Sequence, residues 1–249
     1  MKILYFSGTG NGLYTAKTLA KILGGEYLNL ATCDNNIDDE DIGIVLPNYC
    51  NDVPAFTKKR LQEISFPNAR YIFLIVTAGA SLGMCALSVN SVLKKKGLSL
   101  SYTGLALFVS SFIVTQIPLS RGIRDNMNER GENALTKIAD DIRERKINKV
   151  KGSYLRIPVK GISWGFINAV SKNKKVGGDC IKCGLCESVC PTGNIKVTEM
   201  NVEFYDKCAY CYACAHWCPK EALIYGLKEI KDSKIYRNPH VSVEEMKLR

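Results

Sequence analysis

Eight cysteines gather near the end of the chain, in two runs of identical spacing. The first run reads C-I-K-C-G-L-C-E-S-V-C-P and the second reads C-A-Y-C-Y-A-C-A-H-W-C-P, with an offset of 28 residues between them. Each run follows C-x2-C-x2-C-x3-C-P, in which three thiolates wrap one side of an iron–sulfur cubane and the fourth reaches the neighbouring cluster. The spacing therefore predicts two [4Fe–4S] clusters with crossed ligand sets. The expected ligands are Cys180, Cys183, Cys186 and Cys218 for one cluster, and Cys208, Cys211, Cys214 and Cys190 for the other.

Two other uses of clustered cysteines fit this pattern less well. Zinc sites pair two C-x2-C units and do not pack a third thiolate into the same turn. Disulfides need an oxidising compartment, whereas Met1-Lys2 leads directly into a short apolar run without the pattern of a signal peptide. His216 and Trp217 lie inside the second run, where they would either tune a cluster by hydrogen bonding or pack against the polypeptide.

A second candidate site is the stretch S-G-T-G-N-G at residues 7–12, directly after the apolar run K-I-L-Y-F. A dinucleotide fingerprint would need glycine where the chain has Leu13, and a triphosphate-binding loop would need Gly-Lys-Ser/Thr. The backbone N–H groups and the dipole of a helix that starts here suit a phosphate monoester, and Ser7, Thr9 and Asn11 could donate as well. The alternative is a tight turn that binds no ligand.

Strand and helix signals alternate along the part of the chain that must position this loop. The pattern predicts strands at 2–6, 26–30, 42–46, 71–77 and 102–109, and helices at 11–23, 54–64, 84–96 and 122–146. Such alternation implies a parallel sheet with helices on both faces. The Asp-rich connection 31–41 is too short for a full helix, so we expect an irregular segment there.

The glycine-rich loop resembles the phosphate loop of flavodoxins, since Ser7, Thr9, Gly10 and Asn11 match that family's pattern. Gly12 departs from it, because the family usually has a hydroxyl residue there. The resemblance implies FMN, bound outside the carboxyl ends of strands in the order 2-1-3-4-5.

The same resemblance implies that the loops L-P-N-Y-C-N-D and T-A-G-A-S-L-G enclose the flavin ring. Tyr49 is then a stacking aromatic or an ordinary tyrosine at the rim, and backbone groups near Asn48, Ala78 and Gly79 meet the flavin edge. Cys50 and Cys85 are expected to be free, inert thiols. The predicted FMN-binding residues are Ser7, Gly8, Thr9, Gly10, Asn11, Gly12, Pro47, Asn48, Tyr49, Cys50, Ala78, Gly79, Ala80 and Gly83.

Over nearly its full length the chain resembles the flavodoxin–ferredoxin fusion proteins of anaerobes. The expected fold class is α/β: a flavodoxin-like, doubly wound sheet of five parallel strands, followed by a small α+β domain like a bacterial two-cluster ferredoxin. The expected domains are 1–148 for FMN, a basic linker 149–177, a ferredoxin domain 178–226 and a tail 227–249. Within the linker, 164–170 is expected to form a short helix.

The resemblance implies an electron-transfer protein of low-potential anaerobic metabolism, which relays electrons between two [4Fe–4S] clusters and one FMN. A flavin-dependent reductase of a small molecule and a docking protein that senses redox state are the alternatives. The linker is long enough to reach ~100 Å, so it sets no limit on the distance between cofactors. Transfer within one chain and transfer across a homodimer both stay open.

Composition and charge limit where in the cell the protein is expected and which classes of partner it is expected to bind. The longest apolar stretch, at 105–114, is far below the ~18–20 residues of a membrane span, so we expect a cytoplasmic protein. Residues 151–249 carry 16 basic and 10 acidic residues, a net charge of +6. That excess either is solvated surface or steers an acidic redox partner, such as a ferredoxin-like protein or an oxidoreductase. Nucleic acid is not expected as a partner, because no recognition module is recognisable.

Overall fold

The structure is a computed structural model that describes residues 1–110, 112–113, 119–150, 152, 165, 169, 171, 173–225, 228–229 and 234–248. Most of the expected linker 149–177 lies outside the described residues, and so does most of the short helix predicted at 164–170. None of the described helices is both long and apolar enough to cross a membrane.

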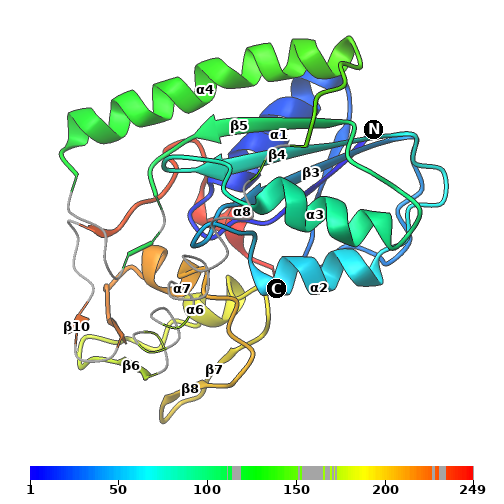
Figure 1. Cartoon of the computed structure of the whole chain (residues 1–249). Coiled ribbons are helices and arrows are strands. Elements are labelled where there is room, and N and C mark those ends of the chain that lie inside the picture. Colours follow the sequence, from blue (N-terminus) through cyan, green and yellow to red (C-terminus); the bar gives the residue numbers. More distant parts are fainter. Residues whose placement is uncertain are drawn as a thin grey trace.

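The N-terminal half contains a five-stranded parallel sheet, as predicted (Figure 1). Its strands are β1 (Lys2–Tyr5), β2 (Glu26–Asn29), β3 (Asp41–Pro47), β4 (Tyr71–Ala78) and β5 (Tyr102–Leu107). They run in the order β2-β1-β3-β4-β5, which is the flavodoxin-like order. Every residue of β4 is buried, as expected for a central strand covered on both faces.

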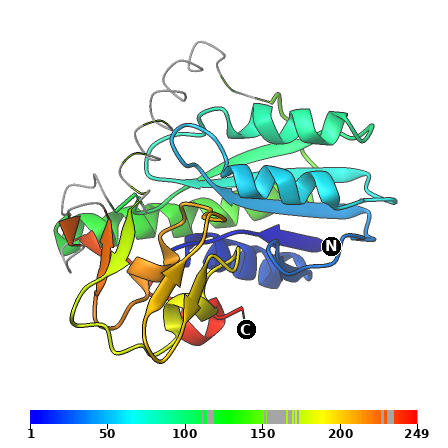
Figure 2. The ribbon, with the colours of Figure 1, turned by 90° about the horizontal axis from the view of Figure 1, so that it is seen from below.

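Four helices cover the two faces of this sheet. They are α1 (Asn11–Leu23), α2 (Ala55–Glu63), α3 (Cys85–Lys94) and α4 (Arg121–Arg143). Helices α1 and α4 lie on one face, and α2 and α3 lie on the other (Figures 1 and 2). Helix α1 has the bounds that the sequence predicts, because Gly24 adopts a left-handed φ of 71° and ends it. The connection 31–41 contains no helix, as expected.

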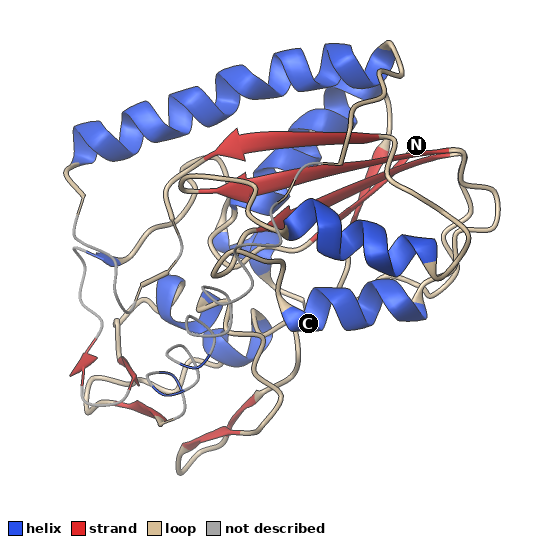
Figure 3. Cartoon of the chain, viewed as in Figure 1, coloured by secondary structure: helices blue, strands red, loops and turns tan. Residues whose placement is uncertain are grey.

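The C-terminal part is built from short elements. They are β6 (Lys174–Val176), α6 (Leu185–Ser188), β7 (Ile195–Val197), β8 (Val202–Phe204), α7 (Ala213–His216), β9 (Leu223–Tyr225), β10 (Lys228–Glu229) and α8 (Val243–Met246). Strands β10-β9-β6 form one antiparallel sheet and β7-β8 another. In Figure 3 this module lies beside the carboxyl ends of the parallel strands.

The 28-residue repeat of the sequence recurs in the backbone of this module. Lys182 and Tyr210 have φ of 53° and 55°, and Gly184 and Tyr212 have φ of 76° and 56°. Both members of each pair are 28 residues apart. The short helices α6 and α7 each start directly after the second left-handed residue. Because left-handed backbone is unfavourable for side chains such as lysine and tyrosine, the matching angles indicate two copies of one loop structure.

The two halves share one hydrophobic core. Val189, Trp217 and Met246 belong to the same buried cluster as the strand residues Leu4 and Leu74. The described end of the predicted tail, 234–248, therefore contributes to the core, and the two halves are joined by more than the linker between them.

Candidate functional site

The structure gathers the eight clustered cysteines into two groups. Cys180, Cys183, Cys186 and Cys218 line one cavity of about 360 Å³, part of it open to solvent. Cys190, Cys208, Cys211 and Cys214 line a second cavity of about the same volume. These groups are the two crossed sets that the spacing predicts, with the last cysteine of each run in the other run's cavity. Within the described residues, no three His, Cys, Asp or Glu side chains are arranged to hold a single metal ion.

Backbone amides point at the sulfur atoms of the crossing cysteines. Asn194 N donates to Cys190 Sγ over 3.2 Å, and Ala222 N donates to Cys218 Sγ over 3.4 Å. These two bonds occupy equivalent positions in the repeat. In the second cavity, Tyr210 N also donates to Cys208 Sγ, and the Tyr225 hydroxyl lies 3.2 Å from Cys214 Sγ. Donors aimed at sulfur favour the thiolate form, which is the form that binds iron.

The thiols of each group lie close together, and their exposure to water differs: Cys211 is buried, whereas Cys183 is exposed. Burial, together with the smaller effect of the neighbouring Cys180, Cys218 and Cys183, raises the pKa of Cys186 to about 11. Burial likewise raises the pKa of Cys214 to about 12. Cys186 and Cys214 are therefore poorly suited to ionise alone, whereas bound iron would stabilise their thiolates. The donor set therefore fits an iron–sulfur cluster in each cavity.

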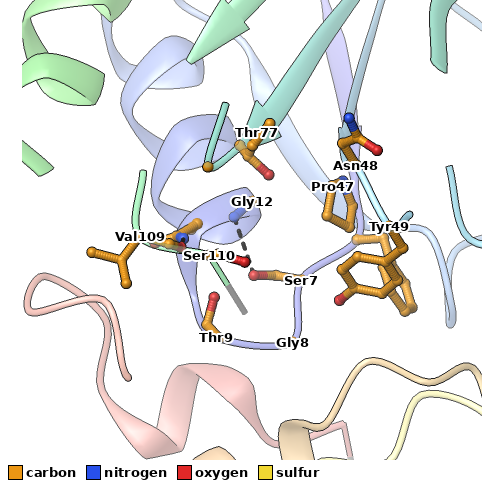
Figure 4. A pocket seen from close by; sticks show the side chains of 14 residues that line it. Ser7, Gly8, Thr9, Gly12, Pro47, Asn48, Tyr49, Thr77, Val109 and Ser110 are labelled. Carbon is orange, nitrogen blue, oxygen red and sulfur yellow. Dashed lines mark hydrogen bonds between the residues drawn. The ribbon is translucent and has the colours of Figure 1, made fainter. Parts of the chain in front are cut away.

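The glycine-rich loop borders a third cavity, of about 350 Å³ and partly open to solvent (Figure 4). Ten predicted FMN-binding residues line it: Ser7, Gly8, Thr9, Asn11, Gly12, Pro47, Asn48, Tyr49, Ala78 and Gly79. None of the described side chains in its lining is a lysine, arginine, histidine or carboxylate. An anion bound there would be held by neutral donors and by the start of α1.

Two amides of the loop converge on one oxygen atom. Gly10 N and Gly12 N donate to Ser7 Oγ over 3.0 and 3.1 Å. Helix α1 starts at Asn11, so the first amides of the helix have no intrahelical acceptor and face the loop. Gly12 leaves no room for the hydroxyl residue usual in flavodoxins, because a Cβ there would lie 2.4 Å from Phe6 O. The loop therefore presents backbone donors, which fits a phosphate monoester.

The polar atoms of the Asn11 side chain form hydrogen bonds with other protein groups rather than facing the pocket. Its Nδ2 donates to Val109 O over 3.1 Å, and its Oδ1 accepts a hydrogen bond from Asn238 Nδ2 over 3.0 Å. The hydroxyl of Tyr236 is also 3.0 Å from Asn11 Oδ1. The prediction that this side chain donates to a phosphate is therefore not what the structure shows, although Asn11 still lines the cavity.

Tyr49 lies at the pocket on a tight turn. Tyr49 N donates to Asp52 O over 2.7 Å and Asp52 N donates to Tyr49 O over 3.1 Å. Cys50 and Asn51, between them, have positive φ of 49° and 72°, as in a type I′ turn. This turn directs Cys50 away from the cavity lining while its neighbour Tyr49 stays in it, 9% exposed.

Four predicted FMN-binding residues do not line the cavity: Gly10, Cys50, Ala80 and Gly83. Gly83, with φ of 57°, instead packs against the turn, because a Cβ there would lie 2.7 Å from Asn51 O. Four residues of the lining were not predicted: Phe6, Thr77, Val109 and Ser110. Val109 and Ser110 follow β5. Because ligands bind at the carboxyl ends of parallel strands, their place after a predicted strand could have identified them.

The phosphate loop touches the second cysteine group directly. A Cβ on Gly8 would lie 2.2 Å from Cys211 O and 3.1 Å from Tyr49 Oη. Trp217, between the last two cysteines of its run, donates from Nε1 to Gly8 O over 2.9 Å and is 5% exposed. The third cavity and the cavity lined by Cys211 are therefore neighbours within one chain.

Sequence comparison agrees with the cysteine geometry. Residues 179–222 match the 4Fe-4S dicluster domain family. This segment is a 4Fe-4S dicluster domain. Joined to the flavodoxin-like sheet, the dicluster domain makes the chain a fusion of a flavodoxin-like and a ferredoxin domain.

Curated relatives match over a stretch about as long as the dicluster domain. Polyferredoxin protein MvhB of Methanothermus fervidus is 47% identical over 45 residues, which are 18% of this chain and 11% of that protein. A component of the ion-translocating oxidoreductase complex of Methanosarcina acetivorans is 47% identical over 45 residues, 18% of this chain and 17% of that protein. The ferredoxin-like protein in the nif region of Trichormus variabilis is 43% identical over 47 residues, 18% of this chain and 40% of that protein. The chain thus spans less than half the length of these relatives.

Solved structures align with low overall similarity. A flavoprotein from Bacteroides eggerthii aligns with a TM-score of 0.36 and 16% identity, over 42% of this chain and 86% of that one. Rubredoxin oxygen:oxidoreductase from Desulfovibrio gigas aligns with a TM-score of 0.35 and 12% identity, over 57% of this chain and 36% of that one. The assignment of the N-terminal fold rests on its strand order.

Proposed function

We propose that this chain is an electron-transfer protein that carries two [4Fe–4S] clusters and one FMN and relays electrons between them, in low-potential anaerobic metabolism. The observation that carries the proposal is the direct contact of Gly8, in the phosphate loop, with the backbone of Cys211 in the dicluster domain. Clusters of this kind move single electrons, and a flavin accepts one or two.

Each cysteine group would hold one cluster through four thiolates. In the cavity nearer the flavodoxin-like domain, Tyr225 would donate from its hydroxyl to the sulfur of Cys214. Burial and the nearby Cys214 hold the pKa of Tyr225 well above its usual value, so the hydroxyl keeps its proton. In the other cavity Cys183 is exposed, which gives an external redox protein access to that cluster.

The pocket beside the glycine-rich loop would hold FMN. The Thr9 side chain and the amide of Gly12, which donates to Ser7 Oγ in the structure, would receive the phosphate, while Pro47 and Tyr49 would contact the flavin ring. Tyr49 is also close to the loop that touches Cys211, because a Cβ on Gly8 would lie 3.1 Å from Tyr49 Oη.

The contacts favour a relay within one chain over one across a homodimer. The cluster held by the Cys211 group would be the neighbour of the flavin, and the one held by the Cys183 group would exchange electrons with the partner protein. Helix α6, which carries Cys186, is in contact with helix α7, which carries Cys214, so the two cavities adjoin. The three sites then form a series: exposed cluster, buried cluster, flavin.

The test is a rapid-mixing measurement without oxygen. Protein purified anaerobically is first analysed for FMN, iron and sulfide. It is then mixed with a reduced ferredoxin, and flavin reduction is followed over a tenfold range of protein concentration at a fixed excess of donor. We expect flavin reduction at a rate that does not depend on the concentration of this protein, because electrons move within each chain. The variant Cys183→Ala serves as a control and should slow the entry of electrons.

Three results would count against this proposal. The absence of flavin from the purified protein would remove its central cofactor. A rate proportional to the concentration of this protein would indicate transfer between chains. Sustained turnover of a small molecule at the flavin would favour the reductase instead, although the described pocket lining offers no acidic or basic side chain to supply protons.

A further inference from the structure

The outer side of the phosphate loop is held by residues from the far end of the chain. Trp217 Nε1 donates to Gly8 O over 2.9 Å, and Asn238 N donates to Thr9 O over 2.8 Å. The Asn238 side chain then donates to Asn11 Oδ1 over 3.0 Å. Three acceptors of the loop, on Gly8, Thr9 and Asn11, are thus occupied by donors that lie more than 200 residues away in sequence.

These donors are themselves fixed in place. Asn238 is 1% exposed, and its Oδ1 accepts a hydrogen bond from His240 N over 3.0 Å. The hydroxyl of Tyr236, also buried, lies 3.0 Å from Asn11 Oδ1 and 2.7 Å from Asn128 Oδ1 on α4. Against Gly10 the fit is close as well, since a Cβ there would lie 3.0 Å from Asn238 Cβ. The segment 234–241 therefore packs on the loop as a rigid support.

This support determines which way the loop amides point. In a trans peptide the C=O of one residue and the N–H of the next point in opposite directions, and the described residues contain no cis peptide. Because Gly8 O is held on the side away from the cavity, the N–H of Thr9 points toward the cavity. Holding Thr9 O outward turns the N–H of Gly10 inward, and Gly10 N does donate to Ser7 Oγ on the inner side.

We infer that Trp217, Tyr236 and Asn238 are positioning residues for the phosphate of the flavin nucleotide. None of the three lines the cavity, but they hold the phosphate loop in the orientation that turns its amides toward the cavity. The inference rests on the proposed function, because it concerns the same FMN site. It has a consequence beyond that function: the flavodoxin-like domain does not form a competent phosphate site without the C-terminal half of the chain.

The experiment compares FMN with riboflavin, which lacks the phosphate. Three full-length variants are used. Trp217→Phe removes the donor to Gly8 O, and Tyr236→Phe removes the hydroxyl beside Asn11 Oδ1 but keeps the ring and its packing. Asn238→Ala removes the side-chain donor to Asn11 Oδ1 and leaves the backbone donor to Thr9 O. Ser242→Ala is the matched control, because it removes the cap of α8 in the same segment and leaves the described loop contacts in place. Binding is measured by quenching of flavin fluorescence on cluster-loaded protein, and iron content verifies that each variant is folded.

We expect each of the three variants to bind FMN roughly five- to tenfold more weakly, at the low end of the effects typical of coupling between sites. Riboflavin affinity should change less than about twofold, since the phosphate interactions are the ones affected. The control should bind both flavins as the wild type does.

The inference would be overturned if all three variants bound FMN as the wild type does, or if riboflavin and FMN lost affinity equally. Should Asn238→Ala fail to fold, Tyr236→Phe decides the question alone. A wild-type protein that binds riboflavin as tightly as FMN would overturn the inference but leave a flavin relay intact, whereas one that binds neither would overturn both.

Discussion

The substitution Gly8→Ala tests the contact between the two domains. In the structure a Cβ at this position would lie 2.2 Å from Cys211 O, an approach that real Cβ atoms do not make. Because the obstacle is backbone, it is not relieved by rotation of a side chain. Gly8 has no positive φ, so alanine adds no backbone strain of its own. The loop and the Cys211 segment would have to separate by roughly 1 Å to reach ordinary van der Waals distance.

The size of the effect follows from the cost of overpacking. An added methyl group in a packed interior typically costs about 1–3 kcal/mol. For a chain of this length each kcal/mol lowers Tm by about 2–4 °C, so Gly8→Ala should melt about 2–12 °C below wild type. FMN should also bind more weakly, and its reduction by the clusters should slow, because the displaced segment joins both sites.

Melting is followed anaerobically by circular dichroism on cluster-loaded protein, with Gly122→Ala as the control. Gly122 lies in the first turn of α4, and a Cβ there would meet no atom within 4 Å. Alanine favours helix over glycine by about 0.5–1 kcal/mol, so the control should keep or raise Tm. If Gly8→Ala melted together with the control and bound FMN normally, the two domains would not be in contact as the structure has them.

Three further predictions concern the individual sites. Cys186→Ala should lower the iron content, measured by iron analysis, from about eight to about four atoms per chain. FMN binding should be retained in this variant, because the described contacts of the phosphate loop are with the other cysteine group. Cys211→Ala should both lose a cluster and bind FMN more weakly. Thr9→Val should weaken FMN by about tenfold in a fluorescence titration but change riboflavin little, and equal losses would show that Thr9 does not meet the phosphate. Burial raises the pKa of Cys50, so the thiolate fraction at pH 8 is lowered. Iodoacetamide should therefore label Cys50 more slowly than a free cysteine and faster as pH rises, and fast labelling at pH 7 in a mass-spectrometric time course would contradict this.

Local features of the chain were predictable from sequence because local chemistry determines them. Helix α1 ends at Leu23 because Gly24 supplies the left-handed conformation that stops a helix. The crossed grouping of the cysteines follows from the spacing of the two runs, and the structure shows that grouping. The sheet order follows from the alternation of strands and helices together with the resemblance of the loop after β1.

The role of the C-terminal segment was not predictable in the same way. Tyr236 and Asn238 form no periodic pattern, and their partner Asn11 is 225 and 227 residues away in sequence. A single polar contact between residues so far apart cannot be recognised from a short stretch of neighbouring sequence. The reach of the linker likewise gave no information about the distance between the sites, because that distance depends on the packing of Gly8 against Cys211 rather than on chain length.

The shared core changes what limits electron transfer in a protein of this kind. Separate flavin and iron–sulfur carriers must first meet by diffusion, and charge steering makes that encounter sensitive to ionic strength. Here Val189, Trp217 and Met246 pack into the core of the flavodoxin-like domain, so parting the two domains would expose apolar surface to water. Folding therefore fixes the distance between the proposed buried cluster and FMN. The rate of electron transfer between them should not depend on salt concentration. Any salt dependence of the whole relay should arise where a partner protein meets the exposed Cys183.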